Sequence, residues 1–433
     1  MAKNKNFGYF MAIWLGEFVS SIGSGLTAFA LGVYVFRATG SAAAVSLVSL
    51  CAFLPSILLN PVGGVLADRF DRRLMMICGD LFSAAGLLYM LICFRSGRLE
   101  TFQVCVGVTI SAVFLALLEP AYKATVTDLL TREEYSRASG LMQLAASAKY
   151  LLSPVIGGFL LTVTDTGTIL VLDISTILIT VSTVALVRSR LHARTKPAEK
   201  PAFFKDMKGG WKAVAGDRGV FAMVALISAV TFYLGILQTL LPPMVLSFSD
   251  SKTLGLVETI SAAGMLPGSL LMGVFTVKRY IPAMSAGFML AGVAMAFLGA
   301  SSIPVLITTA GCMFFCTLPC INACADATIR CRIPDRLQGR AWGLISVLSQ
   351  LGYVLAYACA GVLADGVFNP MLKEGGILSG TVGRLIGTGP GRGIGFMFVL
   401  SGVSVFILGF IMGRIKIIRS MEPPADVQTG SSS

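Results

Sequence analysis

The feature that most limits how this chain can fold is a series of apolar runs, each about 20 residues long. The runs follow one another from Phe10 to Ile417 and are separated by short polar stretches. A helix of about 20 apolar residues crosses a hydrocarbon core of about 30 Å. Lipid offers the backbone no hydrogen-bond partners, and the sequence lacks the alternation typical of a membrane β-barrel, so the runs are predicted to be helices.

The sequence therefore predicts an all-α polytopic membrane protein with about twelve transmembrane helices. The composition supports this fold class, because 55% of the residues are hydrophobic and 13% are charged, whereas an average soluble domain carries about 25% charged residues. The predicted spans are Phe10–Phe36, Ala42–Ala67, Met75–Phe94, Thr101–Tyr122, Ala138–Val163, Thr168–Val187, Val220–Leu246, Thr253–Phe275, Ile281–Ala300, Ile303–Ala325, Ala341–Ala364 and Gly393–Lys416.

The basic residues are distributed unevenly over the predicted loops. If both termini lie on one side of the membrane, that side holds 26 of the 34 Lys and Arg residues and the opposite side holds seven. Loops rich in Lys and Arg stay in the cytoplasm, so both termini are predicted to be cytoplasmic in a multi-pass protein of the cell (inner) membrane. The net charge of +12 is then an orientation signal, and no nucleic-acid partner is expected. The first run is too long for the core of a cleavable signal peptide and is expected to stay in the lipid bilayer.

The longest polar interruption divides the chain into two halves. We predict an N-terminal six-helix half at residues 1–187, a basic cytoplasmic linker at 188–218, a C-terminal six-helix half at 219–417 and a cytoplasmic tail at 418–433. Around Phe203, Phe204 and Trp211 the linker has the pattern of an amphipathic segment that lies on anionic headgroups. The alternative is a solvated tether.

The two halves share an internal repeat at an offset of 203 residues, which is clearest in the fifth and eleventh predicted spans. Since an even number of spans separates the copies, they share one orientation, as in parallel repeats related by an axis along the membrane normal. This topology predicts a cavity between the halves. The matching residues are Arg137, Ala138, Gly140, Leu141, Tyr150, Leu152, Gly158 and Leu160 in the first half and Arg340, Ala341, Gly343, Leu344, Tyr353, Leu355, Gly361 and Leu363 in the second.

The loop after the second predicted span carries a cluster of charges, GVLADRFDRR from Gly64 to Arg73. Asp68 could pair with an Arg or with the N-terminus of a neighbouring helix, forming a latch that breaks when the halves move. The alternative is a loop that only sets orientation. The loop resembles the signature of the major facilitator superfamily, and the resemblance implies a two-domain transporter fold with a cytoplasmic gate. The matching residues are Gly64, Asp68, Arg69, Arg72 and Arg73, while Asp71 replaces the usual Gly.

A second motif lies in the fifth predicted span. Pro154 interrupts the helical hydrogen bonding, and Gly157 and Gly158 allow another helix to approach closely. The segment resembles the antiporter motif of drug-exporting major facilitators. Pro154, Gly157 and Gly158 fit that motif, and Ser153 stands where it prefers Gly.

Further segments resemble the macrolide-efflux branch of the same family, and the similarity extends over nearly the whole chain. It implies the export of amphipathic small molecules, of the macrolide or multidrug type. Siderophores, lipids or metabolites are alternative substrates, because related exporters differ in what they carry. The segments that carry this resemblance are Trp14–Ser21, Thr39–Ala42, Phe53–Pro55 and Leu337–Ile345.

Several ionisable residues fall inside the predicted spans, where a charge is costly without a cavity or a partner. Glu17 lies about two turns into the first span, where desolvation would favour its neutral form and let it bind and release a proton. The macrolide-efflux branch usually has Gln at this position. Lys149, midway through the fifth span, could pair with Glu17 or meet an anionic substrate.

Asp173 and Glu258 lie a little over one turn into the sixth and eighth predicted spans, near the outer face. We consider them, with Glu17, as candidates for proton coupling or for an outer gate. The alternative is that both are helix-end residues whose carboxyls reach water or cap a helix. Glu258 also resembles an acid found at the same place in the macrolide-efflux branch.

No metal or cofactor is expected. Cys312, Cys316, Cys320 and Cys324 recur every fourth residue on one helix, which favours packing of small residues against a neighbouring helix over a thiol or metal site. The glycine-rich segment 387–395 follows no predicted strand, so we interpret it as an external turn and not as a phosphate cradle.

The favoured function is secondary transport. The sequence contains no nucleotide-binding motif, so the energy must come from a gradient or from the substrate itself. We expect a monomer that moves an amphipathic small-molecule substrate by alternating access, with protons as the coupling ion. A passive channel and a transport-derived sensor are alternatives. A membrane-embedded enzyme is disfavoured, because the single His192 lies in a basic loop apart from any plausible catalytic set.

Overall fold

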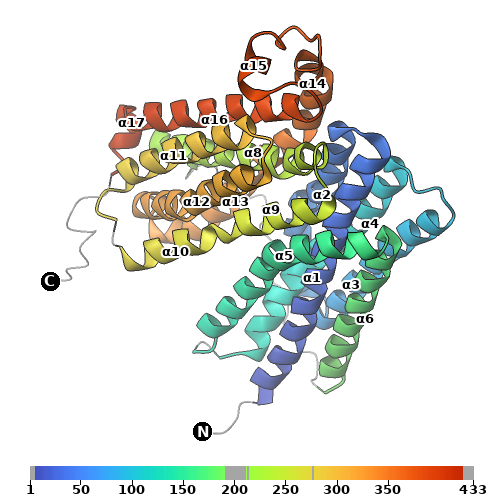
Figure 1. The fold of residues 1–433 in the computed structure, drawn as a ribbon. Coiled ribbons are helices and arrows are strands. Elements are labelled where there is room, and N and C mark those ends of the chain that lie inside the picture. The colour runs from blue at the N-terminus through green and yellow to red at the C-terminus, as the bar shows by residue number, and fades with distance from the viewer. Residues whose placement is uncertain (1–4, 132, 191–210, 212–213, 276, 423–433) are drawn as a thin grey trace. The chain divides into compact units, whose positions relative to one another are not determined.

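The structure is a computed structural model that describes residues 5–131, 133–190, 211, 214–275 and 277–422 (Figure 1). Within these ranges the regular structure is helical, and 12 helical segments are long and apolar enough to cross a membrane. The predicted fold class is confirmed. Most of the expected linker, with Phe203 and Phe204, and most of the expected tail lie outside the described residues.

The chain divides into two compact units. Unit 1 comprises Met1–Pro201 together with Asp250–Leu256, and unit 2 comprises Ala202–Ser249 together with Val257–Ser433. The short segment Asp250–Leu256 packs with unit 1 although it lies far along the chain.

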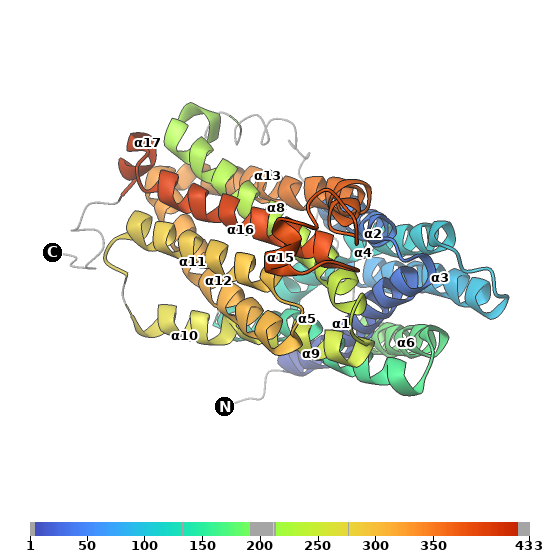
Figure 2. The same ribbon diagram turned by 45° about the horizontal axis from the view of Figure 1, so that its top comes forward.

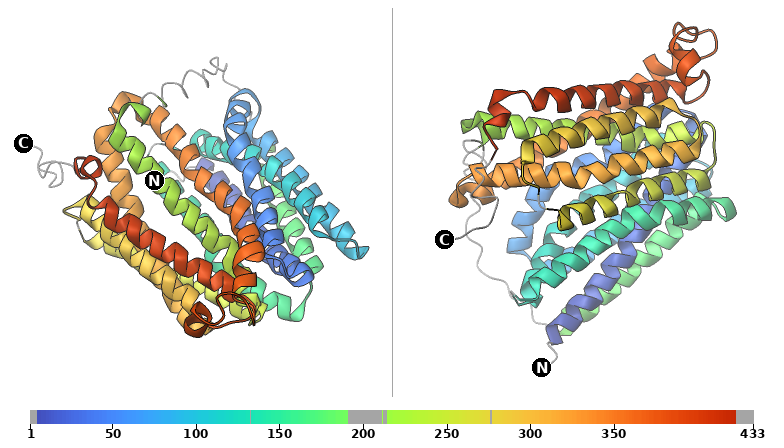
Figure 3. Two further views of the ribbon diagram at one scale, coloured as in Figure 1. Left: turned by 90° about the horizontal axis from the view of Figure 1, so that it is seen from above. Right: turned by 60° about the vertical axis from the view of Figure 1, so that its left-hand side comes forward.

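Unit 1 contains six long helices. Helix α1 packs against α5 and α6, α4 packs against α2 and α3, and α3 also packs against α6. Figure 1 and the right panel of Figure 3 both show α1, α5 and α6 side by side. The helices are α1 (Lys5–Thr39), α2 (Ala42–Arg69), α3 (Arg72–Arg95), α4 (Thr101–Leu129), α5 (Tyr135–Val163) and α6 (Thr166–Arg190).

Local sequence signals set the turns between these helices. Between α1 and α2, Gly40 adopts a φ of 65°, a conformation that glycine reaches without steric cost. The next residue, Ser41, caps α2 by accepting a hydrogen bond from the Ala44 amide at 3.1 Å. Asp71 caps α3 in the same way. The connection from α2 to α3 is therefore short and consists of two residues, Phe70 and Asp71.

Unit 2 packs its long helices in a similar manner. Helix α11 lies against α12 and α16, α8 lies against α13, and α10 lies against α12. The parallel course of α11, α12 and α16 is clear in Figure 2. The elements are α8 (Arg218–Leu246), α9 (Ser251–Ala263), α10 (Met265–Val274), α11 (Tyr280–Ala300), α12 (Pro304–Arg332), α13 (Asp335–Leu363), the π-helix η1 (Ala364–Phe368), α14 (Asn369–Met371), α15 (Val382–Ile386), α16 (Arg392–Met412) and α17 (Lys416–Arg419). The first residues of α9, up to Leu256, belong to unit 1.

The eighth span differs from the continuous helix that the sequence predicts. It is divided into α9 and α10 at Gly264. A Cβ added at Gly264 would lie 2.9 Å from the Cys312 Cα, and one added at Gly268 would lie 3.1 Å from the Cys316 Cα. The cysteine stripe of α12 therefore packs closely against two glycines, the arrangement expected of small residues at a helix interface.

The glycine-rich segment before α16 forms a turn, with φ of 89°, 113° and 76° at Gly387, Gly389 and Gly391. Arg392 follows this turn and is 3% exposed. Its guanidinium donates to the Gly299 carbonyl at 2.9 Å, to the Ser301 carbonyl at 3.0 Å and to the Ser302 hydroxyl at 3.0 Å. A cation thus satisfies the carbonyls at the C-terminal end of α11.

Candidate functional site

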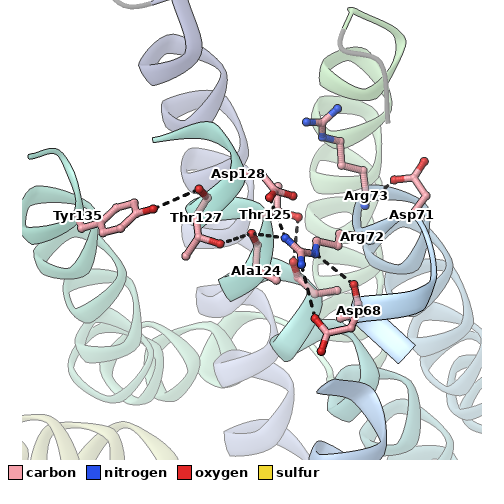
Figure 4. A network of polar contacts seen from close by, with 11 residues as sticks. Asp68, Asp71, Arg72, Arg73, Ala124, Thr125, Thr127, Asp128 and Tyr135 are labelled. Atoms are coloured by element: carbon pink, nitrogen blue, oxygen red, sulfur yellow. Dashed lines mark hydrogen bonds and ion pairs between the residues drawn. The ribbon is translucent and has the colours of Figure 1, made fainter. Parts of the chain in front are cut away.

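The charged loop between α2 and α3 forms a network around Arg72 (Figure 4). One guanidinium nitrogen of Arg72 lies 2.8 Å from an Asp128 oxygen and 3.2 Å from the Ala124 carbonyl, both on α4. Another lies 3.5 Å from Asp68 at the end of α2, and Nε donates to the Ala67 carbonyl at 3.1 Å. One arginine therefore joins the end of α2, the start of α3 and the end of α4.

The structure assigns different environments to the other residues of this motif. The Asp68 side chain is 69% exposed, and Arg69 is also exposed. A Cβ added at Gly64 would meet nothing within 4 Å, whereas one added at the preceding Gly63 would lie 2.8 Å from the Ala116 carbonyl. Close packing of α2 on α4 thus requires Gly63.

Asp71, the departure from the family pattern, accepts hydrogen bonds from two nearby amides and from one distant arginine. It accepts hydrogen bonds from the amides of Arg73 and Leu74 at 3.0 and 3.4 Å, and Arg188 at the end of α6 donates to it at 2.7 Å. Burial raises the pKa of the Asp71 carboxyl, but the hydrogen bonds from Arg188 and the two amides outweigh this effect and hold that pKa below its usual range. Asp71 therefore caps α3 as a carboxylate and ties it to α6.

The motif in α5 lies against α1 and against the start of α9, within unit 1. A Cβ added at Gly157 would lie 2.9 Å from a ring carbon of Phe29, and one at Gly158 would lie 2.6 Å from the Ser251 carbonyl oxygen. Both glycines and Pro154 are buried. Ser153, where the motif prefers Gly, donates to the Ile22 carbonyl of α1 at 3.0 Å. The motif is thus a surface of close helix contact on two sides of α5.

Glu17 lies on α1 beside its contact with α6. The neighbouring Gly16 packs on Thr180 and Thr183, since a Cβ there would lie 3.2 Å from the Thr180 Cα. Glu17 is half-buried, and its Oε1 is buried without a hydrogen-bond partner among the described residues. This is an unusual state for a carboxyl oxygen in a packed helical unit.

Lys149 and Asp173 face the middle of α1. A Cβ at Gly25 would lie 3.1 Å from the Cγ of Lys149, and one at Gly23 would lie 2.8 Å from Oδ1 of Asp173. Asp173 is 1% exposed and lies within electrostatic range of the Lys149 ammonium. The ion pairs within 4 Å in the described part of the chain do not include Lys149. The pairing of Lys149 with Glu17 stays a prediction, and the geometry brings Asp173 into consideration as its counterion.

Sequence reasoning missed a further buried acid, Asp80 of α3. It is 2% exposed, and its carboxyl interacts electrostatically with Glu17 and Asp173. Asp80 lies eight residues after Arg72, where it is easily taken for part of the charged loop. A sign that it belongs to the interior was present, because it lies four residues after Met76 and so on the same helix face.

Unit 2 places fewer charged groups inside its helices. Glu258 on α9 is half-buried, and the adjacent Thr259 hydroxyl has no hydrogen-bond partner in the described residues. Between α8 and α13 the polar contacts are uncharged: Tyr357 donates to Gln238 Oε1 at 2.8 Å, and Ser228 donates to the Leu348 carbonyl at 2.8 Å. The tyrosine–glutamine pair is another polar contact that the sequence did not predict.

A family model described as Major Facilitator Superfamily matches residues 13–357, most of the chain. The chain belongs to the Major Facilitator Superfamily. Membership confirms the family resemblance and identifies the protein as a multi-pass membrane transporter and not an enzyme.

Curated relatives of this Major Facilitator Superfamily chain include efflux proteins. Macrolide efflux protein A of Streptococcus pyogenes is 25% identical over 421 residues, which cover 95% of this chain and 97% of the relative. Multidrug efflux pump Tap of Mycobacterium bovis is 22% identical over 84% of this chain and 88% of its own length. The resemblance to the macrolide-efflux branch is thus confirmed.

Solved structures of transporters share the fold. A bacterial homologue of the human lysosomal transporter Spinster, in an inward-facing and unoccupied conformation, superposes with a TM-score of 0.69 at 13% identity and covers 97% of this chain and 98% of its own. The nucleoside transporter NupG gives a TM-score of 0.70 at 11% identity, with 94% and 100% covered. At this identity the likeness concerns the fold alone.

Proposed function

We propose that this chain is a secondary active exporter of amphipathic small molecules, of the macrolide or multidrug type, which works by alternating access of its two units and by proton antiport. The similarity to Macrolide efflux protein A over 95% of the chain is the observation that carries this proposal. The protein is taken to act as a monomer with both termini in the cytoplasm, as the distribution of Lys and Arg predicts.

The buried acids support proton coupling. A carboxyl inside a membrane span binds a proton more readily than one in water, because desolvation penalises the ion. Glu17 with its unpartnered Oε1 is the first candidate, and Asp173 and Glu258 are candidates nearer the predicted outer face. Proton entry from outside would reset the carrier after the substrate has left.

The charged loop would act as the gate on the cytoplasmic side. Arg72 holds Asp68 at 3.5 Å while it binds Asp128 at 2.8 Å, so Asp68 has the longer and more exposed of the two contacts. An exposed pair of this kind contributes little stability, typically below about 1 kcal/mol. A low cost of release suits a latch, and Asp68 with Arg69 would be the part that opens.

Substrate export is tested in bacteria that lack their own drug pumps. Cells that express the chain are loaded with a labelled macrolide or a fluorescent lipophilic cation, with and without an uncoupler. We expect lower accumulation than in cells without the chain, and we expect the uncoupler to abolish the difference. Full accumulation of both compounds, despite folded protein in the membrane, would contradict drug export and direct the search to siderophores, lipids or metabolites.

The role of Glu17 is tested in the same assay. We expect Glu17→Gln to lose export at equal expression, because the amide cannot bind a proton. The matched control is Glu374→Gln, which removes an exposed acid from the segment between α14 and α15. Unchanged export in Glu17→Gln would show that this carboxyl is not the coupling group, which is compatible with the Gln that related exporters carry there.

A further inference from the structure

Asp80 and Glu17 present two buried carboxyl oxygens that have no partner. Oδ2 of Asp80 and Oε1 of Glu17 are both inaccessible and without a hydrogen bond in the described part of the chain. A buried polar atom left in this state costs about 1–3 kcal/mol. Oδ1 of Asp173 is in the same state, so these buried carboxyls are candidate proton-binding groups.

Helix register places each of the two carboxyls one turn beyond a shared apolar cluster of unit 1. Ile13 and Met76 are fully buried in the same apolar cluster. Glu17 follows Ile13 by four residues, and Asp80 follows Met76 by four, so each acid lies one turn further along the same helix face. Because α2 separates α1 from α3, these two helices run in the same direction, and both steps lead the same way.

Apolar residues enclose this level on both sides. The cluster of Ile13 and Met76 lies on the side of the charged loop. On the other side, a second cluster contains Leu87, seven residues beyond Asp80, and Ile177 of α6. Two turns of helix bring Leu87 back to the face that carries Asp80. The carboxyls thus lie between two apolar layers, where a bare charge is costly.

The surrounding groups do not neutralise both acids. Tyr122 of α4 lies within electrostatic range of Glu17, but its hydroxyl carries no positive charge. Lys149 of α5 acts on Asp173 of α6. The described interior of unit 1 thus holds one base, Lys149, and three acids. With Lys149 beside Asp173, Glu17 and Asp80 have no cation to offset their charges, and two like charges in apolar surroundings cannot both be ionised.

We infer that Glu17 and Asp80 form a coupled carboxyl pair that holds at least one exchangeable proton, with Asp80 as a proton-binding residue on α3. The inference deepens the proposed function, on which its role in transport rests. The site takes only a proton: a carboxylate oxygen binds H⁺ as the chain accepts it from one side and releases it as the carboxylate re-forms. The coupled pair titrates as a unit, so each acid senses the charge of the other.

Infrared spectroscopy of the purified full-length protein in proteoliposomes tests the pair without any substrate. The band of protonated carboxyl groups is followed against pH in the wild-type chain, in Asp80→Asn, in Glu17→Gln and in the double variant. We expect each single variant to lose part of the band. The acid that remains should release its proton at a lower pH than in the wild type, because its negative neighbour is gone. Glu374→Gln is the control and should leave the band in this region unchanged.

Two results would overturn the pair. One is an unchanged band in Asp80→Asn when size-exclusion chromatography shows folded protein. The other is a remaining band in each single variant that titrates at the wild-type pH. If Asp80→Asn does not fold, the shift in Glu17→Gln alone decides, since it reports on Asp80 in a chain that keeps this residue.

The same proteoliposomes separate this inference from the proposed function. Macrolide uptake driven by a pH gradient is measured beside the titration. Coupled titration without macrolide transport supports the proton site and contradicts the substrate. Transport with independent titration of the two acids contradicts the pair and supports the exporter.

Discussion

The contact of α1 with α5 in unit 1 and that of α8 with α13 in unit 2 are two versions of one design. In unit 1, Ser21 donates to the Ala145 carbonyl at 3.3 Å, and in unit 2, Ser228 donates to the Leu348 carbonyl at 2.8 Å. At the repeat offset of 203 residues, Ala145 corresponds to Leu348. Both helix pairs therefore use a hydroxyl of the first helix to bond the backbone of the fifth. The acceptor carbonyls correspond at this offset, and the donor serines do not.

The two contacts differ in charge. The offset that aligns Tyr150 with Tyr353 aligns Lys149 with Gly352. Gly352 lies tightly against α8, whereas Lys149 packs its side chain against α1, with its Cγ 3.1 Å from a Cβ added at Gly25. Since the uncharged version packs well, the fold does not need the lysine. The buried charges of unit 1 are thus better explained by function than by stability.

The largest loss of stability is expected from a substitution that prevents α13 from packing closely on α8 in unit 2. A Cβ at Gly352 would lie 2.6 Å from the Phe232 amide nitrogen, which is rigid helix backbone. We expect Gly352→Leu to destabilise the protein by about 3 kcal/mol, at the upper end of overpacking costs. The measurement is the loss of monodisperse protein on heating, followed by size-exclusion chromatography.

Gly343→Ala is the matched control on the same helix. A Cβ added there meets nothing within 4 Å, so its thermal stability should stay close to the wild type. Equal tolerance of both substitutions would contradict the tight packing of α13 on α8 and remove the basis of the comparison.

A smaller loss of stability is expected at the start of α16 in unit 2, where Arg392 donates three hydrogen bonds to the C-terminal end of α11. Arg392→Gln leaves buried carbonyls unpaired and should destabilise by about 2 kcal/mol. In unit 1 the cap before α6 is exposed: Asp165 accepts from the Thr168 amide at 2.7 Å. Asp165→Ala should lower stability by about 1 kcal/mol, as for other helix caps. An equal fall in melting temperature for both variants would contradict the idea that the buried Arg392 contributes more stability than the exposed Asp165.

Much of the fold was readable from the sequence, but the partners of its buried charges were not. Apolar run length gave the helices, and Lys and Arg gave a predicted orientation, because both depend on local composition. The break of the eighth span at Gly264 depends on contact with Cys312 of another helix. The Tyr357–Gln238 pair was missed for the same reason, because a partner on another helix leaves no local signal. Asp80 did carry a local sign of burial in its spacing from Met76, but its nearness to the charged loop obscured it.

The next prediction concerns Lys149 and Asp173, the charges that unit 2 lacks at the matching contact. Removing either charge leaves the other uncompensated in unit 1. We expect the double variant Lys149→Met with Asp173→Asn to be more stable than the sum of the two single effects, by about 1 kcal/mol. Melting temperatures of all four proteins in one detergent give this coupling energy. Strict additivity would show that the two charges act independently.

The smallest loss of stability is expected at the ion pair of Asp71, before α3, with Arg188, at the end of α6. Asp71 has a pKa below its usual range, because Arg188 and two amides favour its ionised form. A depressed pKa in the folded state stabilises the protein above the ordinary value, near pH 4, and this contribution is lost as the pH falls through the folded value. We expect Asp71→Asn to lower stability by less than about 1 kcal/mol at neutral pH, because the Arg188 side chain is 43% exposed and solvent screens the pair. The difference in melting temperature from the wild type should be constant at neutral pH and shrink below about pH 4. A difference that instead grows toward acid would mean that Asp71 is held by something other than its charge.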